Sequence, residues 1–352
     1  MNSKSIKYVA IVQAVLAAAL FGMSAPFSKI LLNHLSPYFI SALLYLGAGV
    51  GMLMIDWVKK VRKIEKIEAS ITKNELIYVL LMILLDILAP ILLLIGLLKT
   101  NASTASLLNN FEIVATSLIA LFIFKETIGK RLWISIILIT MSSFILSIND
   151  IKSFTFSLGS VLVLLACISW GLENNCTRKL SIKDPIQVVV IKGIGSGFGA
   201  LLIAFFLKQI SWDIAYILFS LVLGFFAYGL SIFLYVTAQR QLGASRTSAY
   251  YAVAPFIGVA LSFVIYSEPI KLSFIVALII MIIGTYFAVN EKHSHNHLHE
   301  YLEHDHRHSH EDGHHNHKHE FVVKGEHSHF HIHEELEHTH EHTPDIHHSH
   351  NH

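Results

Sequence analysis

The sequence predicts an all-α polytopic membrane protein with ten transmembrane helices, built as two inverted five-helix repeats and followed by a disordered, histidine-rich C-terminal tail. Three observations predict this architecture. Of the 352 residues, 53% are hydrophobic and 14% are charged, whereas soluble domains carry about 25% charged residues. Apolar stretches near the ~20 residues that cross a bilayer recur along the chain. All but one of the 24 histidines lie between His293 and His352.

The apolar stretches define the expected spans. In chain order they are 7–32, 38–58, 74–98, 101–124, 130–149, 158–178, 184–208, 212–238, 244–266 and 270–290. The first is too long for the apolar core of a signal peptide, so we expect it to be retained as a helix. In the seventh, glycines alternate from Gly193 to Gly199 with no strand before them. This pattern predicts close helix packing and not a dinucleotide-binding loop.

Basic residues are distributed unequally between the two ends of the spans. Seventeen lysines and arginines fall on the side of the N-terminus, and only Lys99, Lys152, Lys208 and Lys271 fall on the other side. The positive-inside rule therefore predicts that both termini are cytoplasmic, in a bacterial-type plasma (inner) membrane. The formal net charge of +1 gives no basis for nucleic-acid binding. The expected surroundings are the lipid bilayer, and a homodimer is an assembly that the sequence leaves open.

The two halves of the chain resemble each other weakly. Phe21, Gly22 and Lys29 align with Trp170, Gly171 and Arg178, and Ala102, Ser103, Ser106 and Glu126 align with Ala244, Ser245, Ser248 and Glu268. Five spans are an odd number, so the second copy enters the membrane from the opposite side, which makes an inverted repeat. We expect a first five-helix repeat at 1–149, a second at 150–290 and the tail at 291–352.

Several motifs resemble one known family. They are Ser169–Leu180 (SWGLENNCTRKL), Tyr228–Ser231 (YGLS), Ala244–Tyr251 (ASRTSAYY), Ala254–Gly258 (APFIG), and the Lys-Glu and Ser-Glu-Pro endings of the fourth and ninth spans. Over residues 7–290 the chain resembles the EamA branch of the drug/metabolite transporter superfamily, whose histidine-tailed members look similar across the tail too. The resemblance implies a transporter and not an enzyme, with a central cavity and mostly export of small solutes. It does not supply the substrate.

Ionisable residues inside membrane spans are costly, so they usually line a cavity or pair with one another. The expected spans hold five that demand such an explanation, namely Lys29, Asp86, Glu112, Glu173 and Lys192.

Glu112 lies on the most informative of these spans. Ala105, Asn109, Glu112 and Thr116 are three or four residues apart and would form one polar stripe on a helix. Such a stripe predicts a face directed to the interior of the bundle. Its functional interpretation is a substrate or proton site, and its structural interpretation is a hydrogen-bond cluster that joins helices.

Glu173, Asn174 and Asn175 follow one another in the sixth span. Glu173 either lines the cavity or pairs with Arg178 or Lys179 at the membrane interface. Lys192 in the seventh span needs a partner, and Glu112 or Glu173 is the natural one. That pair is either structural or part of a gate.

Aromatic residues and prolines add weaker signals. Tyr250 could stack on or hydrogen-bond a substrate, although interior packing is the usual role of such side chains. Pro26, Pro90 and Pro255 predict helices that bend around a cavity. No catalytic residue is expected. The expected substrate-pathway residues are Asn109, Glu112, Glu173, Asn174, Asn175, Lys192 and Tyr250.

The histidine tail predicts a metal-binding segment, because closely spaced imidazoles are ligands for Zn, Ni and Co. The alternating candidates are His293, His295, His297, His299, His304, His306, His308, His310, His327, His329, His331 and His333. The segment has few apolar residues to bury, so we expect it to be disordered without metal. The alternative is a pH-responsive or solubilising tail. No other cofactor is expected.

Three functions follow as hypotheses. The favoured one is an alternating-access exporter of a divalent transition metal (Ni, Co or Zn), since the tail is predicted to bind such ions. The second is an exporter of an amino acid or another small metabolite, regulated by a metal-sensing tail. The third is a membrane metal sensor that transports nothing. The oxygen-rich polar groups of the spans are not the usual ligands of transition metals, which keeps the second hypothesis open.

Overall fold

The computed structural model describes most of the helical body and parts of the tail. The described residues are 3–62, 71–124, 128–150, 155–178, 180, 183–242, 247, 250–289, 293–299, 302–308, 327–333 and 336–342. Within them, nine helical stretches are long and apolar enough to cross a membrane. The ninth expected span, 244–266, is described chiefly by a shorter apolar helix, Ala254–Tyr266.

The helices follow the expected spans to within a few residues. The first half comprises α1 (Ser3–Gly22), α2 (Ser24–Leu31), α3 (Pro37–Val61), the short 3₁₀ helix η1 (Lys73–Glu75), α4 (Leu76–Lys99), α5 (Ala102–Leu108), α6 (Phe111–Phe124) and α7 (Lys130–Ser147). A hairpin of β1 (Ile148–Asp150) and β2 (Thr155–Phe156) leads to the second half. That half comprises α8 (Leu158–Arg178), α9 (Pro185–Phe206), α10 (Ile214–Gly224), the π-helical η2 (Phe225–Leu230), α11 (Ser231–Leu242), α13 (Ala254–Tyr266) and α14 (Leu272–Val289).

Equivalent helices of the two halves begin in the same way. Ser36 caps α3 by accepting a hydrogen bond from the backbone N–H of Phe39 at 3.2 Å. Asp184 caps α9 by accepting one from the N–H of Ile186 at 2.9 Å. In both helices a proline follows the cap, where its missing N–H costs nothing.

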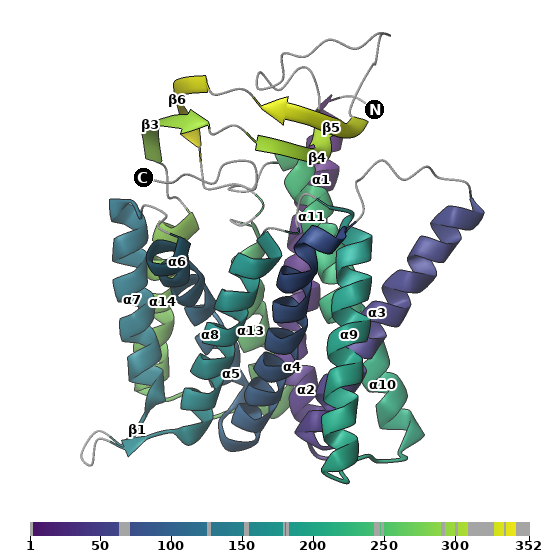
Figure 1. The fold of residues 1–352 in the computed structure, drawn as a ribbon. Coiled ribbons are helices and arrows are strands. Elements are labelled where there is room, and N and C mark those ends of the chain that lie inside the picture. Colours follow the sequence, from purple (N-terminus) through teal and green to yellow (C-terminus); the bar gives the residue numbers. More distant parts are fainter. Residues whose placement is uncertain are drawn as a thin grey trace.

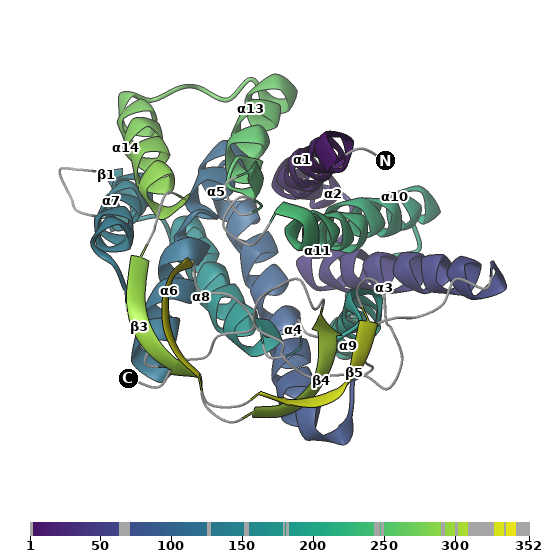
Figure 2. The same ribbon diagram turned by 90° about the horizontal axis from the view of Figure 1, so that it is seen from above.

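The two halves pack into one another. The most extensive contacts between helices are those of α3 with α9 and of α4 with α8, and each joins the first half to the second. Figure 2 shows α4 between α8 and α9, with α3 along α9 and α10. The centre of the bundle is therefore an interface between the two sequence repeats.

The alternating glycines of α9 allow part of this close packing, as expected. A Cβ atom on Gly193 would meet the backbone of Gly49 and Tyr45 in α3, whereas one on Gly199 would meet the flexible end of Ile87 in α4. Backbone cannot move aside as readily as a side-chain terminus.

We therefore expect Gly193→Ala to destabilise the protein by about 1–3 kcal/mol through overpacking. Gly199→Ala is the matched control, since it adds the same methyl group to the same helix. Thermal unfolding in detergent should show a lower midpoint for Gly193→Ala than for Gly199→Ala. Equal midpoints would contradict the close α3–α9 contact.

The tail contains four described strands. They are β3 (His293–His299), β4 (Leu302–His308), β5 (His327–His333) and β6 (Leu336–His342), and β3 pairs with β6 while β4 pairs with β5, both antiparallel. The register sets histidine opposite histidine, for example His295 opposite His340 and His306 opposite His329. Figure 1 shows both ladders at the end of the bundle where α1 begins. Disorder of the metal-free tail stays a prediction.

Candidate functional site

An ion bridge joins the two halves at the centre of the bundle. The Lys192 Nζ on α9 lies 3.1 Å from Asp86 Oδ2 on α4 and 3.0 Å from Glu173 Oε1 on α8. The side chains of Asp86, Glu173 and Lys192 are 0%, 2% and 12% exposed. One ammonium group thus serves two buried carboxylates from different repeats.

Hydroxyl groups complete the bridge. The Tyr45 hydroxyl donates to Asp86 Oδ1 at 2.8 Å, and the Thr177 hydroxyl donates to Glu173 Oε1. These bonds hold the carboxylates in place. Each hydroxyl donates a hydrogen bond to a carboxylate oxygen that is buried away from water.

The sequence predicted only part of this bridge. Glu173 was one of the two expected partners of Lys192, and the structure confirms it. The second carboxylate, Asp86, was not predicted from the sequence as a partner of Lys192. The alternative partners Arg178 and Lys179 have side chains outside the described residues.

Glu112 forms a separate polar contact with α8. Asn174 Nδ2 donates to Glu112 Oε1 at 2.6 Å and lies 3.4 Å from Thr116 Oγ1. Asn175 is different, because its Nδ2 donates to the backbone oxygens of Thr116 at 3.1 Å and Gly171 at 2.8 Å. Asn174 therefore belongs to the candidate site, whereas Asn175 holds α8 against α6.

The expected polar stripe of the fourth span is interrupted. This span consists of α5 and α6, with turn residues Asn109 and Asn110 between them. Asn110 Nδ2 donates to the backbone oxygen of Leu107 at 3.1 Å, the kind of local bond with which asparagine competes with a helix. Asn109 thus lies in the turn itself and Glu112 in the first turn of α6, so the two are not on one continuous helix.

Two further spans are broken. The first is interrupted at Met23, between α1 and α2, and the ninth has turn residues 252–253 before α13. When Ala102 and Ser103 are aligned with Ala244 and Ser245, the breaks of the fourth and ninth spans fall within one residue of each other. Pro255 lies in the first turn of α13; Pro26 lies within α2, while α4 continues through Pro90. Broken helices at a repeat interface are typical of transporter substrate sites.

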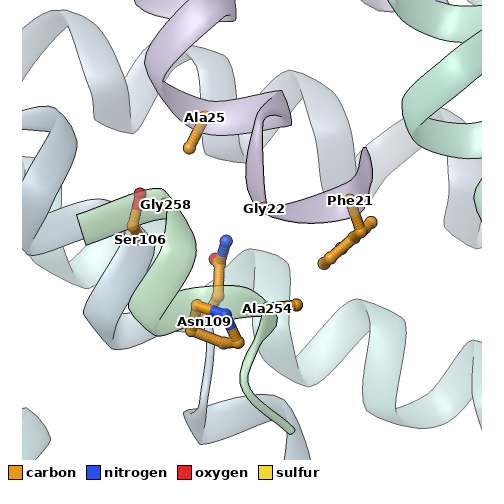
Figure 3. A pocket seen from close by; sticks show the side chains of 8 residues that line it. Phe21, Gly22, Ala25, Ser106, Asn109, Ala254 and Gly258 are labelled. Atoms are coloured by element: carbon orange, nitrogen blue, oxygen red, sulfur yellow. The ribbon is translucent and has the colours of Figure 1, made fainter. Parts of the chain in front are cut away.

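A small pocket of about 10 Å³, room for about one water molecule, lies where these three breaks meet. It is lined by Phe21, Gly22 and Ala25 from α1 and α2, by Ser106 and Asn109 from α5 and its end, and by Ala254, Pro255 and Gly258 from α13 (Figure 3). Of the expected pathway residues, Asn109 lines it. The remaining residues that line the pocket were not predicted as pathway residues. Two features of the sequence pointed to this region, namely Pro255 and the alignment of Gly22 with Gly171 between the two halves.

A chain of aromatic rings connects the pocket with the ion bridge. The ring of Phe21 lies 6.1 Å from that of Tyr228 and 5.8 Å from that of Tyr251, and Tyr45 lies 5.4 Å from Tyr228. Tyr45 in turn bonds Asp86. In this region the described aromatic contacts are made by Tyr251 and not by its neighbour Tyr250, which is half-buried. Contact of Tyr250 with a substrate stays a prediction.

Lys29 lies apart from the bridge. Its Nζ donates to the backbone oxygens of Leu97 and, at 2.6 Å, of Thr100, at the end of α4. Nearby, Glu268 accepts hydrogen bonds from the N–H groups of Ala102 at 2.9 Å and Ser103 at 3.2 Å, at the start of α5. The positive charge of Lys29 thus lies at the C-terminal end of α4, and the negative charge of Glu268 lies at the N-terminal end of α5. Each charge is opposite in sign to the helix dipole at that end.

Metal ligands are not grouped in the described part of the chain. No cluster of three or more His, Cys, Asp or Glu side chains there is placed to hold a metal ion. The predicted ligand His310 lies outside the described residues, and the other predicted histidines are on β3, β4 and β5, where only the backbone is described.

A bundle of apolar helices with a polar centre between two repeats is the architecture of a multi-pass membrane transporter. The model of the EamA-like transporter family matches residues 8–148 and again 157–290. The chain therefore belongs to the EamA-like transporter family and contains two EamA domains. It is a transporter and not an enzyme.

Individual relatives agree with this family. The chain is 29% identical over 295 residues to an uncharacterized transporter of Methanothermobacter thermautotrophicus, covering 79% of this chain and 84% of the relative. It is 21% identical to the uncharacterized transporter YyaM of Bacillus subtilis, over 79% of this chain and 93% of YyaM. A solved crystal structure shares the fold with a TM-score of 0.58 at 13% identity, covering 81% of this chain and 95% of the other.

Proposed function

We propose that this protein exports a small, positively charged solute by alternating access. The observation that carries the proposal is the balance of charge at the centre of the bundle. Three carboxylates, Asp86, Glu112 and Glu173, come from α4, α6 and α8. In the described ion pairs Lys192 contacts Asp86 and Glu173, whereas Glu112 accepts a hydrogen bond from the neutral amide of Asn174. Charges inside a membrane are costly unless compensated. A cationic cargo would supply the missing charge.

Alternating access is supported by the breaks in corresponding spans. In an inverted repeat, equivalent broken helices can exchange roles as the site opens to one side and then to the other. The Asp86–Lys192–Glu173 bridge connects α4 of the first repeat to α8 and α9 of the second. We propose that it keeps these helices together while the broken spans move.

The proposed orientation places both termini in the cytoplasm, where the tail binds Zn, Ni or Co. The density of histidines supports metal binding, and so does the cross-strand register, because opposed residues of an antiparallel pair have Cα atoms about 4.5–5.5 Å apart. The tail makes these divalent ions the first cargo to test. An amino acid or another metabolite with an amino group is the second, supported by the side-chain oxygens of the spans, which are not the usual ligands of transition metals.

Two measurements test export. Cells with and without the gene are compared for their content of Ni, Co and Zn and for their tolerance of these ions. Efflux is then measured from proteoliposomes loaded with each ion or with amino compounds. Protein-dependent efflux of a cation is the expected result. If no solute moves and metal tolerance is unchanged, the alternative of a non-transporting metal sensor is favoured.

Removing the tail separates transport from regulation. We expect a chain that ends at Asn290 to keep the transport rate of the full chain, because every helix of the body is retained. It should lose any dependence of that rate on cytoplasmic Ni or Zn. Flux assays at a series of metal concentrations check this. Loss of transport in the truncated chain would instead make the tail an essential part of the pathway.

A further inference from the structure

The small pocket at the three helix breaks contains two side-chain oxygen atoms with unused hydrogen-bonding capacity (Figure 3). Neither Ser106 Oγ nor Asn109 Oδ1 has a hydrogen-bond partner among the residues that the structure describes, and both atoms are buried. The side chain of Ser106 is enclosed, since the residue is only 2% exposed. Buried polar atoms in proteins are nearly always paired. Two unpaired ones in a single pocket indicate that a bound ion or molecule completes them.

A main-chain oxygen joins these two atoms at the pocket. Gly22 lines it as well, and a helical carbonyl at this position would accept a hydrogen bond from the N–H group four residues later. That residue is Pro26, which has no N–H group. A Cβ atom on Gly258 would lie 2.8 Å from both Gly22 O and Ser106 Oγ. The two oxygens thus flank one space, which stays open because residue 258 is a glycine.

The size of the pocket limits its occupant. Its volume of about 10 Å³ is room for about one water molecule. An organic solute does not fit. Mg²⁺ is also disfavoured, because it gives up its hydration shell reluctantly and usually keeps several waters. A water molecule, or a monovalent ion that has lost its hydration shell, has the required size.

The polarity of the helix ends favours a cation over an anion. Gly22 is the last residue of α1 and Asn109 is the C-cap of α5, so the pocket lies at the partially negative ends of two helices. The third helix, α13, begins here with the opposite polarity, but Pro255 in its first turn has no N–H group to offer an anion. Asn109 Oδ1 is an acceptor with no proton to donate, and an anion would leave it unpaired.

The oxygen types of the pocket are those that replace the hydration shell of an alkali-metal cation in membrane proteins. Backbone carbonyls do so in K⁺ channels. In transporters with broken helices, unwound carbonyls and helix C-terminal ends coordinate Na⁺. All the residues that line this pocket are uncharged, which suits a monovalent ion, whereas Ca²⁺ sites include carboxylates.

We propose that the pocket binds one alkali-metal cation, Na⁺ or K⁺, through Ser106 Oγ, Asn109 Oδ1 and the carbonyl oxygen of Gly22. The three oxygens come from the breaks of the first and fourth spans, and α13 forms the remaining wall. A bound cation therefore fastens these breaks to each other. The inference goes beyond the proposed export, because the ion binds in the absence of any cargo.

Ion binding is measured on the full chain in detergent. The thermal unfolding midpoint is recorded while NaCl or KCl replaces choline chloride at constant ionic strength, since choline is too large for the pocket. A cation that binds only the folded protein should raise the midpoint by about 2–4 °C at ten times its Kd. Equilibrium binding of radioactive Na⁺ or K⁺ should saturate at a single site per chain.

Variants test the pocket itself. Ser106→Ala and Asn109→Leu should each raise the Kd for the cation about tenfold, the loss that corresponds to about 1.4 kcal/mol of binding. Ser135→Ala on α7 is the matched control, since Ser135 is another fully buried serine whose Oγ has no partner among the described residues. Its Kd should be unchanged. Unchanged Kd values in both pocket variants would overturn the site.

The outcomes also separate this inference from the proposed function. Equal midpoints in Na⁺, K⁺ and choline, with no measurable ion binding, would assign the pocket to a water molecule only and overturn the cation site. That result would leave the export of a cationic solute intact. Ion binding without any protein-dependent efflux would support this site and contradict export.

Discussion

Replacing Lys192 with methionine is expected to destabilise the protein by about 3–5 kcal/mol, the typical cost of leaving a buried ion pair without one partner. Here two carboxylates, Asp86 and Glu173, would lose their shared cation at once. The expected result is poor recovery of folded protein and a lowered unfolding midpoint. Thermal unfolding in detergent, followed by size-exclusion chromatography, measures both.

Two companion variants make this test specific. The triple variant Lys192→Met, Asp86→Asn, Glu173→Gln removes all three charges and should recover most of the lost stability, because neutral groups cost far less to bury. Lys208→Met, at an exposed lysine just beyond α9, should behave like the unaltered protein. If Lys192→Met alone is as stable as the unaltered protein, the bridge does not hold the two halves together.

Replacing Glu112 with glutamine is expected to lower the flux of the transported cation by about 10- to 100-fold, while the protein stays folded. Glutamine keeps a side-chain oxygen that can accept the hydrogen bond from Asn174. It removes the negative charge, and a contact to a charged group contributes about 1.5–3 kcal/mol. Initial efflux rates from proteoliposomes, normalised to the amount of folded protein, measure the effect.

The control for Glu112 is a carboxylate far from the site. Glu75 lies 3.4 Å from Lys183, between the start of α4 and the segment before α9. Glu75→Gln should therefore leave the flux unchanged. Full activity of Glu112→Gln would identify Glu112 as a structural group that joins α6 to α8, which is the alternative that the sequence left open.

The spans and their duplication could be predicted because hydropathy is a local property. Each apolar stretch has the length that a bilayer requires, and the family match to both halves supports the repeat. The continuity of a helix is less visible. The fourth span reads as one helix by length, yet a local side-chain bond from Asn110 accompanies a break between α5 and α6.

Pairing across the bundle could be predicted only in part, because it depends on which helices pack together. Lys192 clearly needed a carboxylate, but the choice of Asp86 follows from the packing of α4 against both α8 and α9. The pocket is harder still. Phe21, Ser106 and Ala254 are far apart in the sequence, and only the folded chain brings them to one place.

The ion bridge also constrains the order in which the protein is made. The ribosome completes α4 roughly a hundred residues before it reaches Lys192, so Asp86 enters the bilayer with its cation not yet synthesised. The first half of the nascent chain must therefore wait, with this carboxylate shielded by Tyr45, by water or by the insertion machinery. The two sequence repeats are therefore not independent folding units, because the first cannot complete its buried ion bridge until the second has been inserted.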